Sequence, residues 1–130
     1  MILTLDLGTT SNRCLAIDAK GNCLAQTQQE FPQHFPKPGW VEHNANDIWT
    51  STLTVMQNVL DQLQTPPTAI AITNQRETTV AWDKTTGEPL HNAIVWQCRR
   101  TADRMTQLSD TEKALIKSKT GLPADAYFSA

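Results

Sequence analysis

The chain opens with two short apolar runs that are separated by a polar turn. The first run, residues 2–5, ends at the carboxylate of Asp6, and the second run covers residues 14–17. Between them a glycine at position 8 permits a tight reversal, and three consecutive hydroxyl side chains follow, those of Thr9, Thr10 and Ser11. A hairpin of this composition points backbone N–H groups and hydroxyls into one concavity, with a carboxylate at its mouth. The pattern therefore predicts a site for a phosphate group together with a divalent cation.

Asp6 is the predicted metal ligand of this turn, because its carboxylate is placed to hold Mg²⁺ directly or through water. The alternative is that Asp6 only caps the turn by accepting a hydrogen bond from a backbone N–H. Gly8 lets the backbone approach a phosphate closely, and the three hydroxyl residues supply donors. Arg13 is either a charge clamp for the phosphate or a solvated residue at the start of a strand.

The composition argues against several classes of partner. A chain of 130 residues with a formal net charge of −2 suits one domain and offers no electrostatic surface for nucleic acid or an anionic membrane. No apolar run approaches the roughly 20 residues that a membrane span needs, and the first residues do not resemble a signal peptide. The cysteines Cys14, Cys23 and Cys98 lack metal-ligand spacing, so we expect buried, reduced thiols in a cytoplasmic protein.

Hydrophobic periodicity predicts three strands at residues 2–6, 13–18 and 23–30, followed by a loop rich in proline and glycine at residues 31–43. A helix is then predicted to begin after an N-cap at Asn44 and to end before Pro66. Its apolar residues recur at intervals of three and four, at Trp49, Leu53, Met56, Leu60 and Leu63.

Residues 69–74 are nearly all apolar, which predicts a strand that is buried on both faces. Residues 78–83 alternate and predict another strand, and residues 93–96 predict a further strand or extended segment. Residues 99–108 have a helical pattern, and Ser109 with Glu112 forms a capping box for a last helix that ends at Gly121.

Three antiparallel strands, a crossover helix and a buried strand form the pattern of an α/β, ribonuclease H-like mixed sheet. The helical crossover makes the strand at residues 69–74 parallel to the first strand and lets it lie directly beside it. Asp6 and the polar residues that follow Ile72 then emerge at the same carboxyl edge, where ligands of open α/β sheets bind.

A second polar segment, residues 73–79, follows this apolar strand. Within it Arg76 and Glu77 offer five donors and two acceptor oxygens, which suits a vicinal diol because each hydroxyl both donates and accepts. The alternative is an exposed ion pair in a hairpin. Trp96 is either a core residue or an apolar wall against the C–H edges of a small polyol. Tyr127 by itself gives almost no indication of a function.

Four segments of the chain resemble those of known proteins. The segment at residues 6–11 looks like the first phosphate motif of the actin, hexokinase and heat-shock protein 70 superfamily. Three further blocks are similar to kinases that phosphorylate glycerol, namely residues 37–43, 72–79 and 92–102. By these segments the chain resembles the FGGY carbohydrate kinases. The resemblance covers residues 2–129. It identifies residues 1–130 as part of an N-terminal kinase domain, in which the first lobe is incomplete.

The resemblance implies that the longer protein transfers a phosphoryl group from ATP to glycerol, with Mg²⁺ as cofactor and glycerol 3-phosphate and ADP as products. In the family's pattern Asp6 matches the aspartate that is linked to the metal, and Trp96 matches the apolar wall of the substrate site. The positions that contact the nucleotide phosphates correspond to Thr9, Thr10, Ser11 and Arg13. The positions that hydrogen-bond to the polyol correspond to Arg76, Glu77 and Tyr127.

The family's catalytic aspartate, second phosphate loop and adenosine pocket lie in later segments, so no catalytic residue is assigned here. We therefore expect these 130 residues alone to be inactive. We also expect the full-length protein to be a homo-oligomer. Two positions depart from the pattern of the kinases that act on glycerol: Leu7 stands where Gln is usual, and Asn12 where Ser is usual. The alternatives are another polyol or pentulose kinase, or a non-catalytic nucleotide-binding module.

Overall fold

The computed structural model describes residues 1–129, and contacts within the chain divide it into two compact units. The first unit contains Met1–Gln33 and Asn44–Gln75. The second unit contains His34–His43 and the chain from Arg76 onward. The turn that carries Asp6 belongs to the first unit, whereas Arg76 and Glu77 belong to the second.

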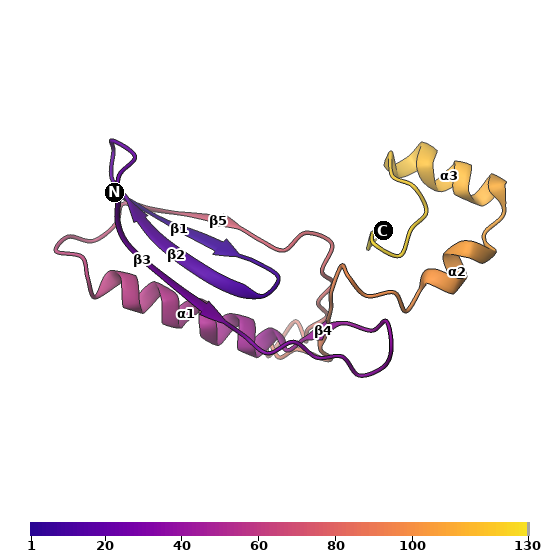
Figure 1. Ribbon diagram of the computed structural model, residues 1–130, viewed down its shortest axis with the longest axis horizontal. Helices are drawn as coiled ribbons and strands as arrows, with labels where there is room; N and C mark the ends of the chain where they lie inside the picture. Colours follow the sequence, from indigo (N-terminus) through magenta and orange to yellow (C-terminus); the bar gives the residue numbers. More distant parts are fainter. Residues whose placement is uncertain (130) are drawn as a thin grey trace. The chain divides into compact units, whose positions relative to one another are not determined.

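A four-stranded mixed sheet forms the first unit, with its strands in the order β3-β2-β1-β5 (Figure 1). Strands β1 (Ile2–Leu7), β2 (Ser11–Ile17) and β3 (Cys23–Glu30) pair antiparallel, as the two apolar runs and the following strand predicted. Strand β5 (Ala69–Thr73) lies parallel to β1. The predicted mixed sheet and the position of its parallel strand are therefore confirmed.

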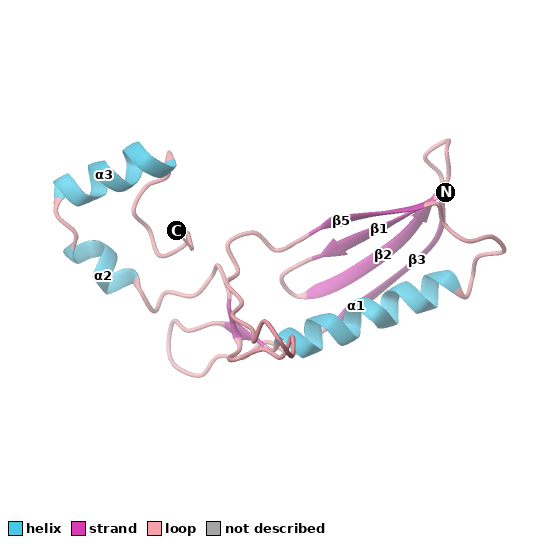
Figure 2. Cartoon of the chain, turned by 180° about the vertical axis from the view of Figure 1, so that it is seen from behind, coloured by secondary structure: helices cyan, strands magenta, loops and turns pink. Residues whose placement is uncertain are grey.

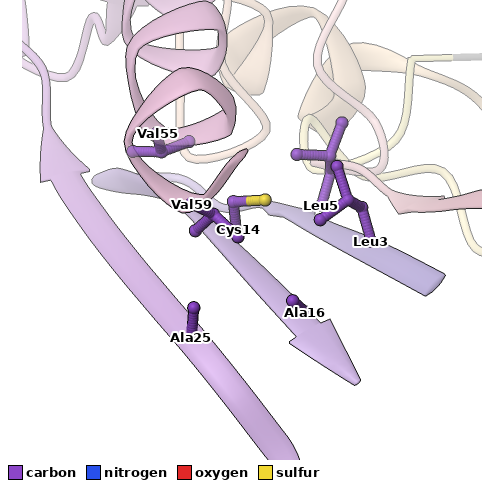
Figure 3. Packing of buried hydrophobic residues seen from close by; sticks show 7 residues of the cluster. All are labelled: Leu3, Leu5, Cys14, Ala16, Ala25, Val55 and Val59. Atoms are coloured by element: carbon purple, nitrogen blue, oxygen red, sulfur yellow. The ribbon is translucent and has the colours of Figure 1, made fainter. Parts of the chain in front are cut away.

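Helix α1 (Ala45–Leu60) runs along one face of this sheet (Figure 1). Its cap is the predicted one, because the side-chain oxygen of Asn44 accepts a hydrogen bond from the N–H of Asn46 at 2.9 Å. Val55 and Val59 point from the helix into a buried apolar cluster (Figure 3). The other members of this cluster come from the sheet and are Leu3, Leu5, Cys14, Ala16 and Ala25.

The face of α1 that packs on the sheet differs from the one that its largest apolar residues indicated. Trp49 and Leu53 are exposed, whereas Ser51 and Thr52 are buried. The reason is polar: both hydroxyls lie within hydrogen-bond distance of the buried Asn12 side chain on β2. Apolar spacing cannot show this contact. The remaining predicted positions pack partly buried against the cluster, namely Met56, Leu60 and Leu63.

The prediction that residues 69–74 are buried on both faces is wrong for the described chain. Every residue of β5 is exposed, and the side chains of Ile70 and Ile72 are 51% and 66% exposed. Strand β5 stands at the edge of the sheet and pairs only with β1 among the described strands. The apolar composition identified a strand correctly, but its neighbours decide whether that strand is covered.

Short elements and loops make up most of the second unit (Figure 2). Strand β4 (Glu42–His43) pairs antiparallel with β6 (Ala93–Ile94), so the predicted strand at residues 93–96 is shorter than expected. The predicted strand at residues 78–83 forms isolated bridges instead, which join Thr79 to Ile94 and Trp82 to Pro89. Each bridge joins only one pair of residues, and the two bridges do not extend into a continuous ladder.

Two helices follow, α2 (Ala102–Gln107) and α3 (Asp110–Thr120), so the helix predicted at residues 99–108 begins later than expected. The predicted capping box is present, because Ser109 and Glu112 exchange both hydrogen bonds. Gly121 ends α3 with φ of 76°, the left-handed conformation that the sequence predicted. No helix in residues 1–129 is long and apolar enough to cross a membrane.

The cysteines have different surroundings. Cys14 and Cys98 are buried free thiols, as predicted. Cys23 is a free thiol but is exposed, so the prediction of burial is wrong there. Cys23 begins β3, and its register partner Ile17 lies at the irregular end of the β2–β3 ladder, where the pairing shifts.

Candidate functional site

The turn between β1 and β2 is closed by its own backbone. The N–H of Gly8 donates to the carbonyl oxygen of Ser11 at 3.0 Å. A Cβ atom on Gly8 would lie 2.9 Å from that same oxygen, closer than real Cβ contacts allow. Glycine is therefore required here by space and not by a left-handed backbone, since Gly8 is not among the glycines with positive φ.

Residues after β3 hold this turn from outside. The N–H of Phe31 donates to the carbonyl oxygen of Thr10 at 3.3 Å. The side-chain amide of Gln33 donates to the carbonyl oxygen of Thr9 at 3.1 Å. These two bonds anchor the backbone carbonyls of the turn to the segment that follows β3. That the turn presents donors to a phosphate stays a prediction.

Asp6 and Arg13 face each other across the β1–β2 ladder. Because side chains alternate along a strand and Leu5 and Cys14 point into the core, Asp6 and Arg13 lie on the opposite face, where both are exposed. Thr73 is the parallel register partner of Asp6 on β5, so the ends of these two strands meet at one edge as predicted.

Gln28 is a neighbour of the turn that no sequence motif indicated. It is the register partner of Arg13 on β3, and its amide nitrogen donates to the Ser11 hydroxyl oxygen at 2.8 Å. A hydroxyl that accepts from an amide keeps its own proton to donate elsewhere. Counting out from the β2–β3 turn would have placed Thr27 opposite Arg13, because the pairing shifts by one residue between Ala16 and Ile17.

The donor set around Asp6 fits Mg²⁺. No cluster of three or more His, Cys, Asp or Glu side chains that could hold a metal occurs in residues 1–129. Mg²⁺ usually keeps several waters and is bound through one or two carboxylates together with phosphate oxygens. One exposed carboxylate beside a turn of hydroxyls and N–H groups meets that requirement, so the residues present fit Mg²⁺ that is bound together with a phosphate.

A hollow of about 300 Å³ in the second unit brings together three of the four predicted substrate residues, which are Glu77, Trp96 and Tyr127. The rings of Trp96 and Tyr127 pack with their centroids 5.2 Å apart at 57°. Arg76 is exposed and is not among the lining residues. The lining combines an aromatic wall with carboxylates, which suits a small ligand with C–H edges and hydroxyl donors.

Two carboxylates at this hollow are held by hydrogen bonds. Oε2 of Glu77 accepts from both the N–H and the hydroxyl of Ser129, each at 2.9 Å. Oδ1 of Asp125 accepts from the N–H of Tyr127 and from Nη1 of Arg99, each at 2.8 Å. These bonds hold the pKa of each carboxyl below its usual value, with the backbone N–H as the largest cause in both.

A buried ion pair supports the segment that carries Trp96. Nη2 of Arg100 lies 2.7 Å from Oε1 of Glu42, and the guanidinium also stacks 3.9 Å from the ring centroid of Trp40. Asn92 donates to the second carboxylate oxygen of Glu42 at 3.2 Å. The Arg100 hydrogen bond is the main cause that lowers the pKa of Glu42. The sequence did not signal this pair, because its residues lie 58 positions apart.

Comparison with known proteins agrees with these features. The model of the FGGY family of carbohydrate kinases, N-terminal domain, matches residues 1–130.

The chain belongs to the FGGY family of carbohydrate kinases.

Curated relatives named glycerol kinase are among its similar proteins. The chain is 52% identical to that of Thermococcus onnurineus over 132 residues, which is 99% of this chain and 27% of the relative. It is 54% identical to that of Pediococcus pentosaceus over 133 residues, or 99% of this chain and 26% of the relative. The chain thus spans about a quarter of the length of the curated relatives that it matches.

Solved structures of the family confirm the fold. The crystal structure of Plasmodium falciparum glycerol kinase with ADP matches with a TM-score of 0.87 at 33% identity, over 99% of this chain and 27% of that chain. A ligand-bound xylulose kinase from Lactobacillus acidophilus matches with a TM-score of 0.90 at 20% identity, over 97% and 26% of the two chains. The second likeness shows the fold alone. The predicted α/β fold of the actin and hexokinase type is therefore confirmed.

Proposed function

We propose that this chain is the N-terminal part of an ATP-dependent glycerol kinase, which converts glycerol to glycerol 3-phosphate. The observation that carries the proposal is the hollow that groups Glu77, Trp96 and Tyr127. The relatives named glycerol kinase are more than half identical to the chain, and this similarity favours glycerol as the substrate.

The polyol would be recognised by donors, acceptors and an apolar wall. Glu77 accepts from hydroxyl groups of the substrate, and Arg76 and Tyr127 complete the hydrogen bonds to those hydroxyls. Trp96 packs against the C–H edges of the carbon chain. A three-carbon polyol exposes hydroxyls on one side and C–H groups on the other, and this set of side chains can satisfy both.

The nucleotide phosphates would bind at the turn between β1 and β2. The proposed contacts are the N–H and hydroxyl groups of Thr9, Thr10 and Ser11, with Arg13 as an additional cation. Asp6 would hold Mg²⁺, which neutralises charge on the phosphoryl group that is transferred. This chain's own residues bind and orient the two reactants, and we assign the catalytic base to the remainder of the longer protein. We further propose a cytoplasmic, homo-oligomeric enzyme.

A coupled assay of ADP formation by the complete protein tests this function. We expect turnover with glycerol that requires Mg²⁺, and much lower kcat/KM with xylulose or gluconate. A preference for xylulose would replace glycerol by a pentulose as substrate. Nucleotide binding without turnover of any polyol would instead indicate a non-catalytic nucleotide-binding module.

A further inference from the structure

Ser129 makes two hydrogen bonds to one oxygen atom of Glu77. Its N–H and its hydroxyl both donate to Oε2 at 2.9 Å, although the two residues are 52 positions apart in the sequence. Both residues line the hollow that also contains Trp96 and Tyr127. The contact therefore lies inside the proposed polyol site, and no motif of the sequence points to Ser129.

Glu77 also has an unusual backbone. Its φ is 61°, and it is the one residue besides glycine with positive φ in the described part of the chain. This left-handed conformation is uncommon for residues other than glycine and persists where the surroundings enforce it. The side chain therefore leaves the backbone in a direction that an ordinary extended or helical residue would not give it. Such outliers cluster at ligand sites.

A carboxylate has two oxygens and about four acceptor positions. The Ser129 bonds both end on Oε2, and Oε1 takes part in neither. Two bonds to one oxygen remove the free rotation of the carboxylate about its last single bond, so the direction of Oε1 is fixed as well. A fixed acceptor binds a hydroxyl more tightly than a rotating one, because less conformational freedom is lost on binding.

We infer that Ser129 is a positioning residue of the polyol site: it holds Oε2 of Glu77 so that Oε1 accepts from a hydroxyl of the substrate. The inference rests on the proposed function, since it concerns the same site. Ser129 acts through Glu77 and not by contact with the reacting atoms. Its hydroxyl supplies the part of the contact that a side-chain substitution can remove, while its N–H remains.

The test measures glycerol and ATP dependence of the complete protein carrying Ser129→Ala. We expect KM for glycerol and the calorimetric Kd for glycerol to rise roughly tenfold, the size expected for one charge-assisted hydrogen bond. KM for ATP should not change. Ser129→Thr retains the hydroxyl and should restore the glycerol constants. Ser118→Ala is the matched control, because the hydroxyl of this exposed serine bonds only to the Leu115 carbonyl within α3.

Glu77→Gln separates the inference from the proposed function. In that background Ser129→Ala should add little, since the charged partner is gone. If Glu77→Gln weakens glycerol binding but Ser129→Ala does not, the positioning role is overturned and the polyol site stands. If Glu77→Gln leaves glycerol binding unchanged, both are overturned.

A general structural role for Ser129 would give a different result. Ser129→Ala would then raise both KM values together, and this outcome also overturns the inference. Should Ser129→Ala fail to fold, Ser129→Cys keeps the side-chain size with a weaker donor. A selective rise in KM for glycerol would then support the inference, and an unchanged value would refute it.

Discussion

The side-chain amide of Asn12 on β2 donates a hydrogen bond of 2.9 Å to the backbone carbonyl oxygen of Ile48 on α1. The same nitrogen lies 2.7 Å from the Ser51 hydroxyl and 2.9 Å from the Thr52 hydroxyl. Asn12 is fully buried and directly follows Ser11 in the chain. The helix is therefore tied to the strand that leaves the proposed phosphate turn, by a polar contact inside an otherwise apolar interface.

Asn12→Ala is expected to loosen α1. Removing a buried donor leaves the helix carbonyl and hydroxyls with fewer partners, which costs about 1–3 kcal/mol of local stability. The loss of stability is reduced because the substitution also removes Oδ1 of Asn12, a buried oxygen without a hydrogen-bond partner. Amide hydrogen exchange should show faster opening of α1 and β2. Asn46→Ala, at an exposed position of the first helical turn, is the control and should change exchange little.

The Glu42–Arg100 pair should contribute far more to stability than the exposed pair in the same unit. Glu42→Gln leaves a largely buried guanidinium without its counter-charge, and we expect a loss on the order of 3 kcal/mol. Arg99 and Asp125 form an ion pair whose side chains are 51% and 44% exposed, so Arg99→Gln should reduce stability far less. Hydrogen exchange of β4 and β6 measures the difference. Equal effects of the two substitutions would show that burial does not decide the value of these pairs.

His43 should make stability depend on pH. Burial lowers its pKa to about 4, with a smaller contribution from His34, whereas an unfolded histidine titrates near 6.5. Between pH 6.5 and about pH 4, His43 binds a proton in the unfolded chain but stays neutral in the folded chain. The stability that neutral His43 provides is therefore fully present above pH 6.5. It falls by up to about 3 kcal/mol as the pH is lowered to about 4. Urea unfolding between pH 7 and pH 4 measures it. His43→Asn should flatten that dependence, and an unchanged slope would contradict the assignment.

Gly8→Ala should disturb the phosphate turn specifically. The added Cβ would meet the Ser11 carbonyl oxygen at 2.9 Å, so the turn must open. If the proposed phosphate contacts are correct, KM for ATP in the complete protein should rise roughly tenfold or more. A loss of about 1.4 kcal/mol of binding free energy weakens binding tenfold. Gly21→Ala strains the β2–β3 turn, where φ is 85° but nothing crowds the new Cβ. That control should reduce stability and leave KM for ATP unchanged.

The parts of the fold that local chemistry determines were predictable. The first three strands, the capping box at Ser109 and the left-handed Gly121 follow from alternation, side-chain capping and backbone freedom. The parallel place of β5 beside β1 follows from the handedness of crossover connections. Each of these features depends on a few neighbouring residues or on a general rule of chain topology.

Features that depend on distant partners were not predictable. Burial of Ser51 and Thr52 in place of Trp49 depends on Asn12, which lies on another element. The exposure of β5 depends on which segments cover the edge of the sheet. The polar segment at residues 73–79 left a diol contact and an exposed ion pair open for Glu77, and only the family resemblance favoured the diol contact. The hydrogen bonds between Glu77 and Ser129 required the structure.

If this chain carries the polyol contacts of a glycerol kinase, Arg76→Ala in the complete protein should weaken the binding of glycerol. Calorimetry should show a loss of roughly 1.5–3 kcal/mol in glycerol binding, as expected when a charged hydrogen-bonding partner is removed, with nucleotide binding unchanged. Lys84→Ala, which removes an exposed cation in the same unit, should leave both constants unchanged. A glycerol dissociation constant for Arg76→Ala equal to that of the unmodified protein would show that Arg76 does not bind the polyol.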